Sequence, residues 1–380
     1  MIDPQNATIV GTLPSSSNIL SAAVQSLDTD GRPSASLFTT TADRRLSLLE
    51  TPSCALKASW TTIQDSPILS CVAFNQKYLL VSSMSGQIVL ADASGKVLEK
   101  RRDHMKYVVQ IAISTNGDRP AIATAGWDNK VNIYTPLTSD PPQLGEPSAT
   151  ITLPTKPESI TFLTHPEIQQ TILLISRTDS THLYYYTTES EPRLLGRQNL
   201  APHSNAWVAF TPSAIALCPT DPSLIAVATS AVPSMKLLIV RLLIPPWGEK
   251  EASAHAPALR TSLLDDNPTV TETQASQARA ALAVADKEHA AISIHCTTLA
   301  PQTAYSTPAV AWRPDGTGVW VNGDDGAIRG IEANSGKIVA TLAGHEPGSK
   351  VRCLWAGKVG EEEWLISGGF DQRLIVWKAG

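Results

Sequence analysis

LAGHEPGSKVRCLWAGKVGEEEWLISGGFDQRLIVWK, residues 342–378, is the stretch that decides the fold of this chain. It contains three short apolar runs with alternating character, which extend from Val351 to Trp355, from Trp364 to Ser367 and from Leu374 to Trp377. Glycines, an aspartate and other turn-forming residues separate the runs. Short alternating runs with turns between them predict three consecutive antiparallel strands.

Four side chains of this stretch have counterparts earlier in the chain, three of them at the same spacing and the fourth a His upstream. A Ser stands four residues before an Asp, a Trp stands six residues after it, and a His lies upstream; these are His345, Ser367, Asp371 and Trp377. The earlier set has Thr for Ser and Tyr for Trp, and consists of His104, Thr124, Asp128 and Tyr134. A buried indole, hydroxyl and imidazole each need a hydrogen-bond partner, and the carboxylate supplies an acceptor.

This pattern resembles that of WD-repeat β-propellers, in which four-stranded blades form a ring. In that family the His, the Ser or Thr, the Asp and the Trp form a hydrogen-bonded tetrad that locks each blade. The resemblance therefore implies a structural role for both sets, and it argues against a catalytic triad of His345, Asp371 and Ser367. It also implies that similar units recur about every forty to fifty residues.

Strand-like runs divide the chain into seven such units, which begin near Ile19, Pro67, Asp103, Glu158, Ala214, Ala309 and Gly344. The last unit supplies only three strands of its own, and the isolated run Ala7–Leu13 is the obvious fourth. Pairing of that run with the last unit would close the ring and remove an exposed edge. We therefore predict an all-β, seven-bladed WD-repeat propeller that spans residues 1–380 as a single domain.

Two segments interrupt the repeat. Residues 136–149 form a Pro-rich loop, and residues 245–290 form a larger insertion between the third and fourth strands of unit five. The insertion begins without periodicity, which predicts a flexible segment. Residues 271–291 are rich in Ala and begin with the capping-box pair Thr271 and Gln274, so we expect a helix there. Its weak apolar stripe predicts docking on the propeller or on a partner, or fraying in water.

The composition predicts a protein of the cell interior without a nucleic-acid or membrane surface. The chain has 30 basic and 35 acidic residues, so its bulk charge gives no reason to expect either. Its five cysteines show no CxxC pairing, which favours free thiols in a reducing compartment. We see neither a signal peptide nor a run as long as a membrane span. We expect a cytoplasmic or nuclear protein that is monomeric by itself.

The strands expected to line the central channel argue against an enzyme. They read ILSAAVQS, ILSCVAF, YVVQIAI, SITFL, AIALC, AVAWR and VRCLW, and none contains Asp, Glu or His. No cluster with metal-ligand spacing and no phosphate-binding glycine loop is found. We therefore expect no catalytic residues, no metal site and no cofactor.

Surface recognition is the function class that remains. In the WD-repeat family the residue before the turn Asp lies on the face where partners commonly bind, which here points to Trp127 and Phe370. Exposed aromatic side chains are typical interface anchors, although Trp127 has an equal chance of packing on its own blade. The first residues of two inner strands would add charged contacts on the same face: Lys106, Tyr107, Lys350 and Arg352.

We interpret the chain as a non-enzymatic scaffold or adaptor, one subunit of a multiprotein complex. One alternative is a reader of modified peptides such as histone tails, which requires an acidic or aromatic pocket at the mouth of the channel. A less favoured alternative is a propeller-based hydrolase. The helical insertion is a second candidate for contact with a partner.

Overall fold

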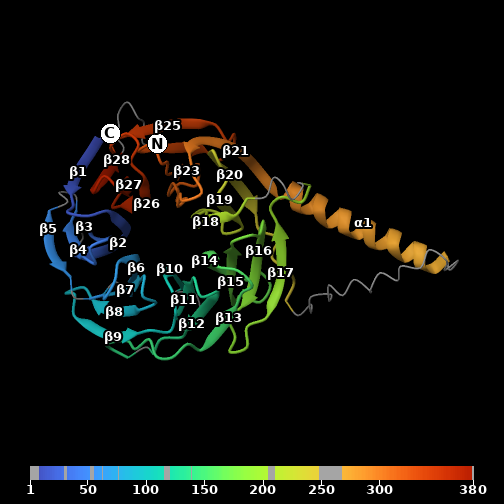
Figure 1. Ribbon diagram of the computed structural model, residues 1–380, viewed down its shortest axis with the longest axis horizontal. Helices are drawn as coiled ribbons and strands as arrows, with labels where there is room; N and C mark the ends of the chain where they lie inside the picture. Colours follow the sequence, from blue (N-terminus) through green and yellow to red (C-terminus); the bar gives the residue numbers. More distant parts are fainter. Residues whose placement is uncertain are drawn as a thin grey trace.

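The computed structural model describes residues 8–29, 32–51, 55–61, 63–75, 77–114, 120–137, 139–203, 210–247 and 268–378, with the backbone alone at 8, 10–14, 26–29, 32–34 and 268–276. Within these residues the strands form seven four-stranded antiparallel sheets. The sheets surround a central opening like the blades of a propeller (Figure 1). The predicted all-β, seven-bladed architecture is therefore confirmed.

Blades 1 to 6 are each built from strands that follow one another in the chain, the first strand lying innermost. Blades 1 to 3 consist of β2 (Ile19–Thr29), β3 (Arg32–Thr41), β4 (Leu46–Glu50) and β5 (Leu56–Trp60); β6 (Ile68–Phe74), β7 (Tyr78–Ser83), β8 (Ile88–Asp92) and β9 (Val97–Arg101); and β10 (Val108–Ser114), β11 (Ala121–Gly126), β12 (Lys130–Tyr134) and β13 (Ala149–Thr152). Blades 4 and 5 consist of β14 (Pro157–Thr164), β15 (Thr171–Arg177), β16 (His182–Thr187) and β17 (Leu194–Asn199); and β18 (Pro212–Leu217), β19 (Leu224–Thr229), β20 (Ser234–Arg241) and β21 (Ile292–Pro301). Blade 6 consists of β22 (Val310–Trp312), β23 (Gly318–Val321), β24 (Ala327–Glu332) and β25 (Ile338–Ala343).

Blade 7 joins the two ends of the chain. It contains β26 (Val351–Val359), β27 (Glu362–Gly369) and β28 (Arg373–Lys378), and its outer strand is β1 (Thr8–Pro14). β1 pairs antiparallel with β28, from Thr8 opposite Lys378 to Pro14 opposite Arg373. The predicted closure by a strand near residues 7–13 is therefore present, and both ends of the chain lie in one sheet (Figure 1).

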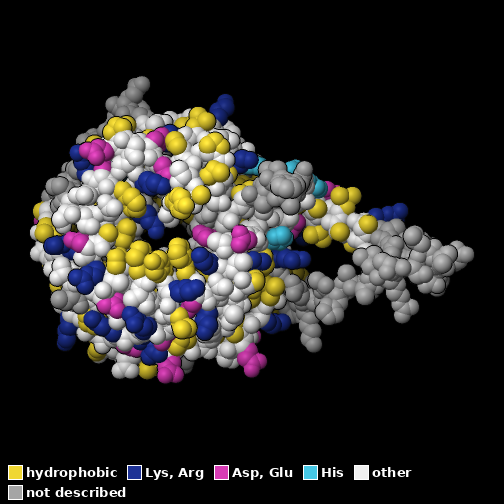
Figure 2. Space-filling view, in the orientation of Figure 1, with side chains coloured by type: hydrophobic (Ala, Val, Ile, Leu, Met, Phe, Trp, Pro, Cys, Tyr) yellow, Lys and Arg dark blue, Asp and Glu magenta, His cyan; other side chains and the backbone are white. Residues whose placement is uncertain are grey.

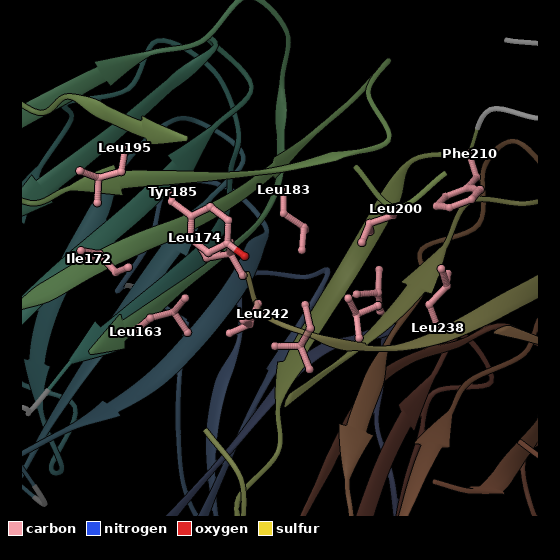
Figure 3. Close-up of a cluster of buried hydrophobic side chains, with 13 residues drawn as sticks. Leu163, Ile172, Leu174, Leu183, Tyr185, Leu195, Leu200, Phe210, Leu238 and Leu242 are labelled. Atoms are coloured by element: carbon pink, nitrogen blue, oxygen red, sulfur yellow. The ribbon is translucent and has the colours of Figure 1, made fainter. Parts of the chain in front are cut away.

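The core of the described chain is divided among the interfaces between neighbouring blades. Each of seven buried clusters takes its side chains from two adjacent blades. The cluster between blades 4 and 5, for example, contains Leu174 and Tyr185 from blade 4 and Leu238 from blade 5, all fully buried (Figure 3). Because both faces of each sheet are covered, most middle strands are apolar at consecutive positions, as in β7, where every residue is buried.

The insertion in blade 5 contains one helix among the described residues. α1 (Pro268–Ala290) lies between β20 and β21 and projects away from the ring (Figure 1). Only its last turns touch the propeller: Glu288 is buried and accepts a hydrogen bond from the Asn199 backbone N–H at 2.7 Å. Leu282, in the expected apolar stripe, is 58% exposed, so this part of the stripe is not docked on the propeller. The expected flexible segment begins at Pro245, and its residues 248–267 lie outside the described residues, as do the side chains of Thr271 and Gln274.

Deletion of residues 1–14 tests whether closure of the ring stabilises the fold. Loss of the β1–β28 ladder exposes the edge of blade 7, and we expect the free energy of unfolding to fall by about 3 kcal/mol or more. Urea unfolding monitored by circular dichroism measures the change. A synthetic peptide of residues 1–18, added in excess, should restore part of the lost stability. Unchanged stability after the deletion would contradict the role given to β1.

Candidate functional site

In blade 7 the predicted tetrad forms a continuous buried hydrogen-bond network. His345 Nδ1 lies 2.9 Å from Asp371 Oδ2, and its Nε2 lies 2.8 Å from Ser367 Oγ. The Trp377 indole N–H donates to the same Ser367 oxygen at 3.0 Å. Burial lowers the pKa of His345 although Asp371 opposes this, so a neutral ring donates through Nδ1 and accepts at Nε2. The network joins the loop between β25 and β26 to β27 and β28.

Blade 3 contains the second network, with one difference at the aromatic position. His104 Nδ1 lies 3.0 Å from Asp128 Oδ1, and His104 Nε2 lies 2.9 Å from Thr124 Oγ1. The Tyr134 hydroxyl reaches outward and donates to Asp103 Oδ2 at 3.0 Å. Asp128 Oδ2 also accepts the Met105 backbone N–H at 3.0 Å, which ties the loop before β10 to the turn that carries Trp127.

A half-exposed aromatic platform lies on the face above this network. The rings of Trp127 and Tyr107 stack at 5.0 Å with an interplanar angle of 22°. The Lys156 ammonium, from the start of blade 4, lies 4.6 Å from the centre of the Trp127 ring. These three residues line an open pocket of about 460 Å³ together with Met84, Ser85, Arg102, Met105 and Lys106. Trp127 thus packs on its neighbours and still borders the pocket.

Phe370 and Lys350 occupy the equivalent positions in blade 7. The Phe370 N–H donates to the Lys350 carbonyl at 2.9 Å, as the Trp127 N–H does to the Tyr107 carbonyl at 2.8 Å. Phe370 is 40% exposed, whereas the Lys350 ammonium is paired with Asp324 at 2.9 Å. The structure therefore places these residues on the same face as Trp127, in a different blade. Lys156 is the equivalent residue of blade 4, a repeat position from which the sequence analysis could have identified it.

A second group of residues surrounds the mouth of the channel on this face. In six inner strands the pairing register shifts at the second residue, which leaves one extra residue in a β-bulge. We call these six positions the mouth ring: Leu20, Leu69, Val109, Glu158, Ser213 and Arg352. Leu20, Leu69 and Arg352 belong to none of the inter-blade clusters. These three residues of the mouth ring are thus set apart from the packed core, whereas Val109 packs against the cluster between blades 3 and 4.

Arg352 and Glu158 are the charged members of the mouth ring. Among the described side chains, neither has an ion-pair or hydrogen-bond partner. Burial lowers the pKa of Arg352, and burial raises the pKa of Glu158 to about 7 although Lys156 opposes the shift. The expectation that no inner strand carries an acidic residue was wrong, because β14 begins at Pro157 and so includes Glu158, and β2 extends far enough to include Asp28. The alternating pattern of β14 begins only after the bulge, which hid Glu158.

Hydrogen bonds between blades fix several bulges. The Thr40 hydroxyl donates to the Ile68 carbonyl at 3.2 Å, and the Ser82 hydroxyl donates to the Val108 carbonyl at 3.0 Å. The Asn322 amide donates to the Val351 carbonyl at 2.6 Å. Each acceptor immediately precedes a residue of the mouth ring, so the neighbouring blade holds the backbone at that point.

The part of the chain that the structure describes offers neither a metal site nor a membrane-spanning helix. No group of three or more His, Cys, Asp or Glu side chains there is arranged to hold a metal ion. No described helix is long and apolar enough to cross a membrane.

Comparison with known proteins agrees with the fold. A family model described as UCP007778, beta-propeller domain, matches residues 32–378. No curated protein matches the chain.

The blade 7 network predicts a large effect for a small substitution. Ser367→Ala removes the acceptor of the Trp377 indole and the partner of His345 Nε2, and we expect a loss of about 2–4 kcal/mol of unfolding free energy. Ser367→Thr keeps the hydroxyl, as Thr124 does in blade 3, and should cost less. Urea titrations of both variants provide the measurement. Equal losses would show that packing, not the hydroxyl, matters.

Because the pKa of His182 is lowered in the folded protein, we expect the free energy of unfolding to be sensitive to acid. Burial and the nearby Arg197 and Arg177 lower its pKa to about 4, from 6.5 in an unfolded chain. Between these values the unfolded state binds a proton that the folded state does not, so stability should fall as the pH decreases from 6.5 to 4. His182→Gln should reduce this fall, which is measured by melting temperatures at pH 7.5 and pH 4.5. An identical pH dependence in the variant would contradict the assignment.

Proposed function

We propose, from the premise that this chain belongs to the UCP007778 beta-propeller domain family, that it is a non-enzymatic scaffold for protein–protein contacts. In this proposal the repeats are of the WD type, and the closed ring presents one face to a protein partner within a multiprotein complex. The observation that supports the proposal best is the platform formed by Trp127, Tyr107 and Lys156.

The platform has the composition of an interface centre. Aromatic and cationic side chains are enriched where interfaces are most strongly buried. Trp127 and Tyr107 are held in place by contact with each other, so their side chains would lose little conformational entropy when a partner binds. Met105, which is 87% exposed beside them, adds an adaptable apolar surface.

The charges around the platform favour an acidic partner surface. Lys106, Lys156 and Arg102 line the same pocket as the aromatic rings. Asp65 pairs with Arg102 at 2.9 Å and offsets one of these charges, which leaves two lysines for a partner. Phe370, Lys350 and Arg352 would extend the contact across the face toward blade 7. Lys156 already covers part of the Trp127 ring, which makes this pocket a poor fit for a methylated lysine.

A native pull-down of the full chain with mass spectrometry tests the proposal, and we expect Trp127→Ala to reduce capture of the main partner at least about tenfold. Trp247→Ala is a matched control: like Trp127, Trp247 lies beneath a cationic side chain, with the Arg193 guanidinium 5.2 Å from the centre of its ring, but it contacts His165 at the opposite end of the inner strand β14. Capture should survive this control. Capture that both variants reduce equally, or the absence of any stoichiometric partner, would overturn the proposal.

A further inference from the structure

Arg352 has an arrangement that a ligand would complete. Its guanidinium is partly buried, and no described side chain provides a counter-charge or an acceptor. An enclosed charge without a partner is costly to fold around. The Asn322 amide of blade 6 donates to the Val351 carbonyl at 2.6 Å. This hydrogen bond fixes the backbone at the residue before Arg352. The fold thus holds an unneutralised guanidinium at the mouth of the channel.

The surroundings of Arg352 are apolar on one side. β26 contacts β2 of blade 1, and β2 contacts β6 of blade 2, so the mouth ring continues from Arg352 to Leu20 and Leu69. Both leucines are 8% exposed and lie outside the inter-blade clusters. Figure 2 shows hydrophobic side chains along the rim of the opening over β2, β6 and β10, with basic side chains over β26.

The opposite side of the mouth carries acidic side chains (Figure 2). Glu158 lies in blade 4, three blades away from Arg352 in the ring of seven. Figure 2 shows acidic side chains over β14 and β18, across the opening from β26. The two sides of the mouth therefore differ: the Arg352 guanidinium favours an anion at blade 7, whereas the Glu158 carboxyl, when ionised, disfavours one at blade 4.

We propose that the channel mouth binds a peptide carboxylate that adjoins an apolar side chain, with the carboxylate on the Arg352 guanidinium and the apolar group against Leu20 and Leu69. A guanidinium binds a carboxylate through two parallel hydrogen bonds, and this geometry selects the group as well as the charge. The carboxylate has two sources, the end of a partner chain or an Asp or Glu side chain beside an apolar residue. The inference rests on the proposed function only in that the ligand is a peptide.

The polarity of the mouth also orients the ligand. When a peptide places its carboxylate at Arg352, the residues that precede the carboxylate extend across the mouth toward Glu158. A Lys or Arg among these residues would meet the Glu158 carboxylate. We therefore expect Glu158→Gln to leave carboxylate binding in place and to weaken the preference for an upstream basic residue.

Selection from a randomised hexapeptide library against the full chain tests the proposal. One half of the library ends in a free Leu, Ile, Val or Phe, and the other half has the same residues amidated. Enriched peptides are resynthesised and their dissociation constants measured by fluorescence anisotropy. Tighter binding of the free acid, about tenfold or more, assigns the carboxylate to the chain end; binding that survives amidation but is lost on Asp→Asn or Glu→Gln in the peptide assigns it to a side chain.

Variants of the protein link the result to the mouth. Arg352→Gln should abolish the enrichment, and Arg352→Lys should recover it only in part because an ammonium lacks the paired donors. Arg197→Gln, a change of the same kind on the outer strand β17, should have no effect. Circular dichroism confirms that each variant is folded.

Two outcomes would overturn the inference: no carboxylate-dependent peptide, or peptides that bind Arg352→Gln as tightly as the unmodified chain. Failure here is distinguishable from failure of the proposed scaffold function. Capture of a partner that depends on Trp127 and is unaffected by Arg352→Gln would keep the platform and reject the peptide site.

Discussion

Apolar contact between adjacent blades is the interaction on which the rest of the structure depends. No blade can bury its own two faces, so each sheet is stable only between two others, and the series ends only when the ring closes. The seven buried clusters occupy these interfaces in turn. This arrangement uses nearly all the apolar surface of the middle strands, and it leaves chemistry to the loops and to the ends of the inner strands.

The tetrad of blade 3 connects this architecture to the proposed recognition face. Asp128 follows Trp127 directly and holds both His104 and the Met105 backbone N–H. The Trp127 N–H in turn donates to the Tyr107 carbonyl. The buried network and the exposed platform are therefore consecutive parts of one turn. A structural motif orders the residues that would meet a partner, so their conformation is established before binding.

The sequence predicted the ring well because strands, turns and tetrads are local patterns. Even blade 5, which lacks tetrad residues, was located by its alternating runs, and the pairing of Trp377 with Ser367 was implied by the resemblance to the WD-repeat pattern. What lies between blades was harder to predict. Lys156 reaches Trp127 from the next blade, and Glu158 stands on a bulge where the period of two fails. Arg352 lacks an ion-pair or hydrogen-bond partner among the described side chains because of the residues that the folded ring places around it. The spacing of residues within one repeat does not reveal these neighbours.

The helix of blade 5 illustrates the same limit. Its composition predicted a helix correctly. The part of the helix that docks on the propeller depends on the hydrogen bond between Glu288 and Asn199, which are far apart in the chain. The exposed Leu282 shows that a weak apolar stripe alone does not dock a helix.

Closure through β1 and β28 has a consequence for the chain as an object. The first and last strands are neighbours in one sheet, so the ring has no structural beginning. The fold therefore does not require the chain to start and stop in blade 7. A short linker between the two ends would yield a circularly permuted protein whose new ends fall in a loop of another blade. In such a molecule β28 and β1 of blade 7 are connected by the polypeptide chain. The blade that contains the new ends is then closed only by hydrogen bonds between its strands.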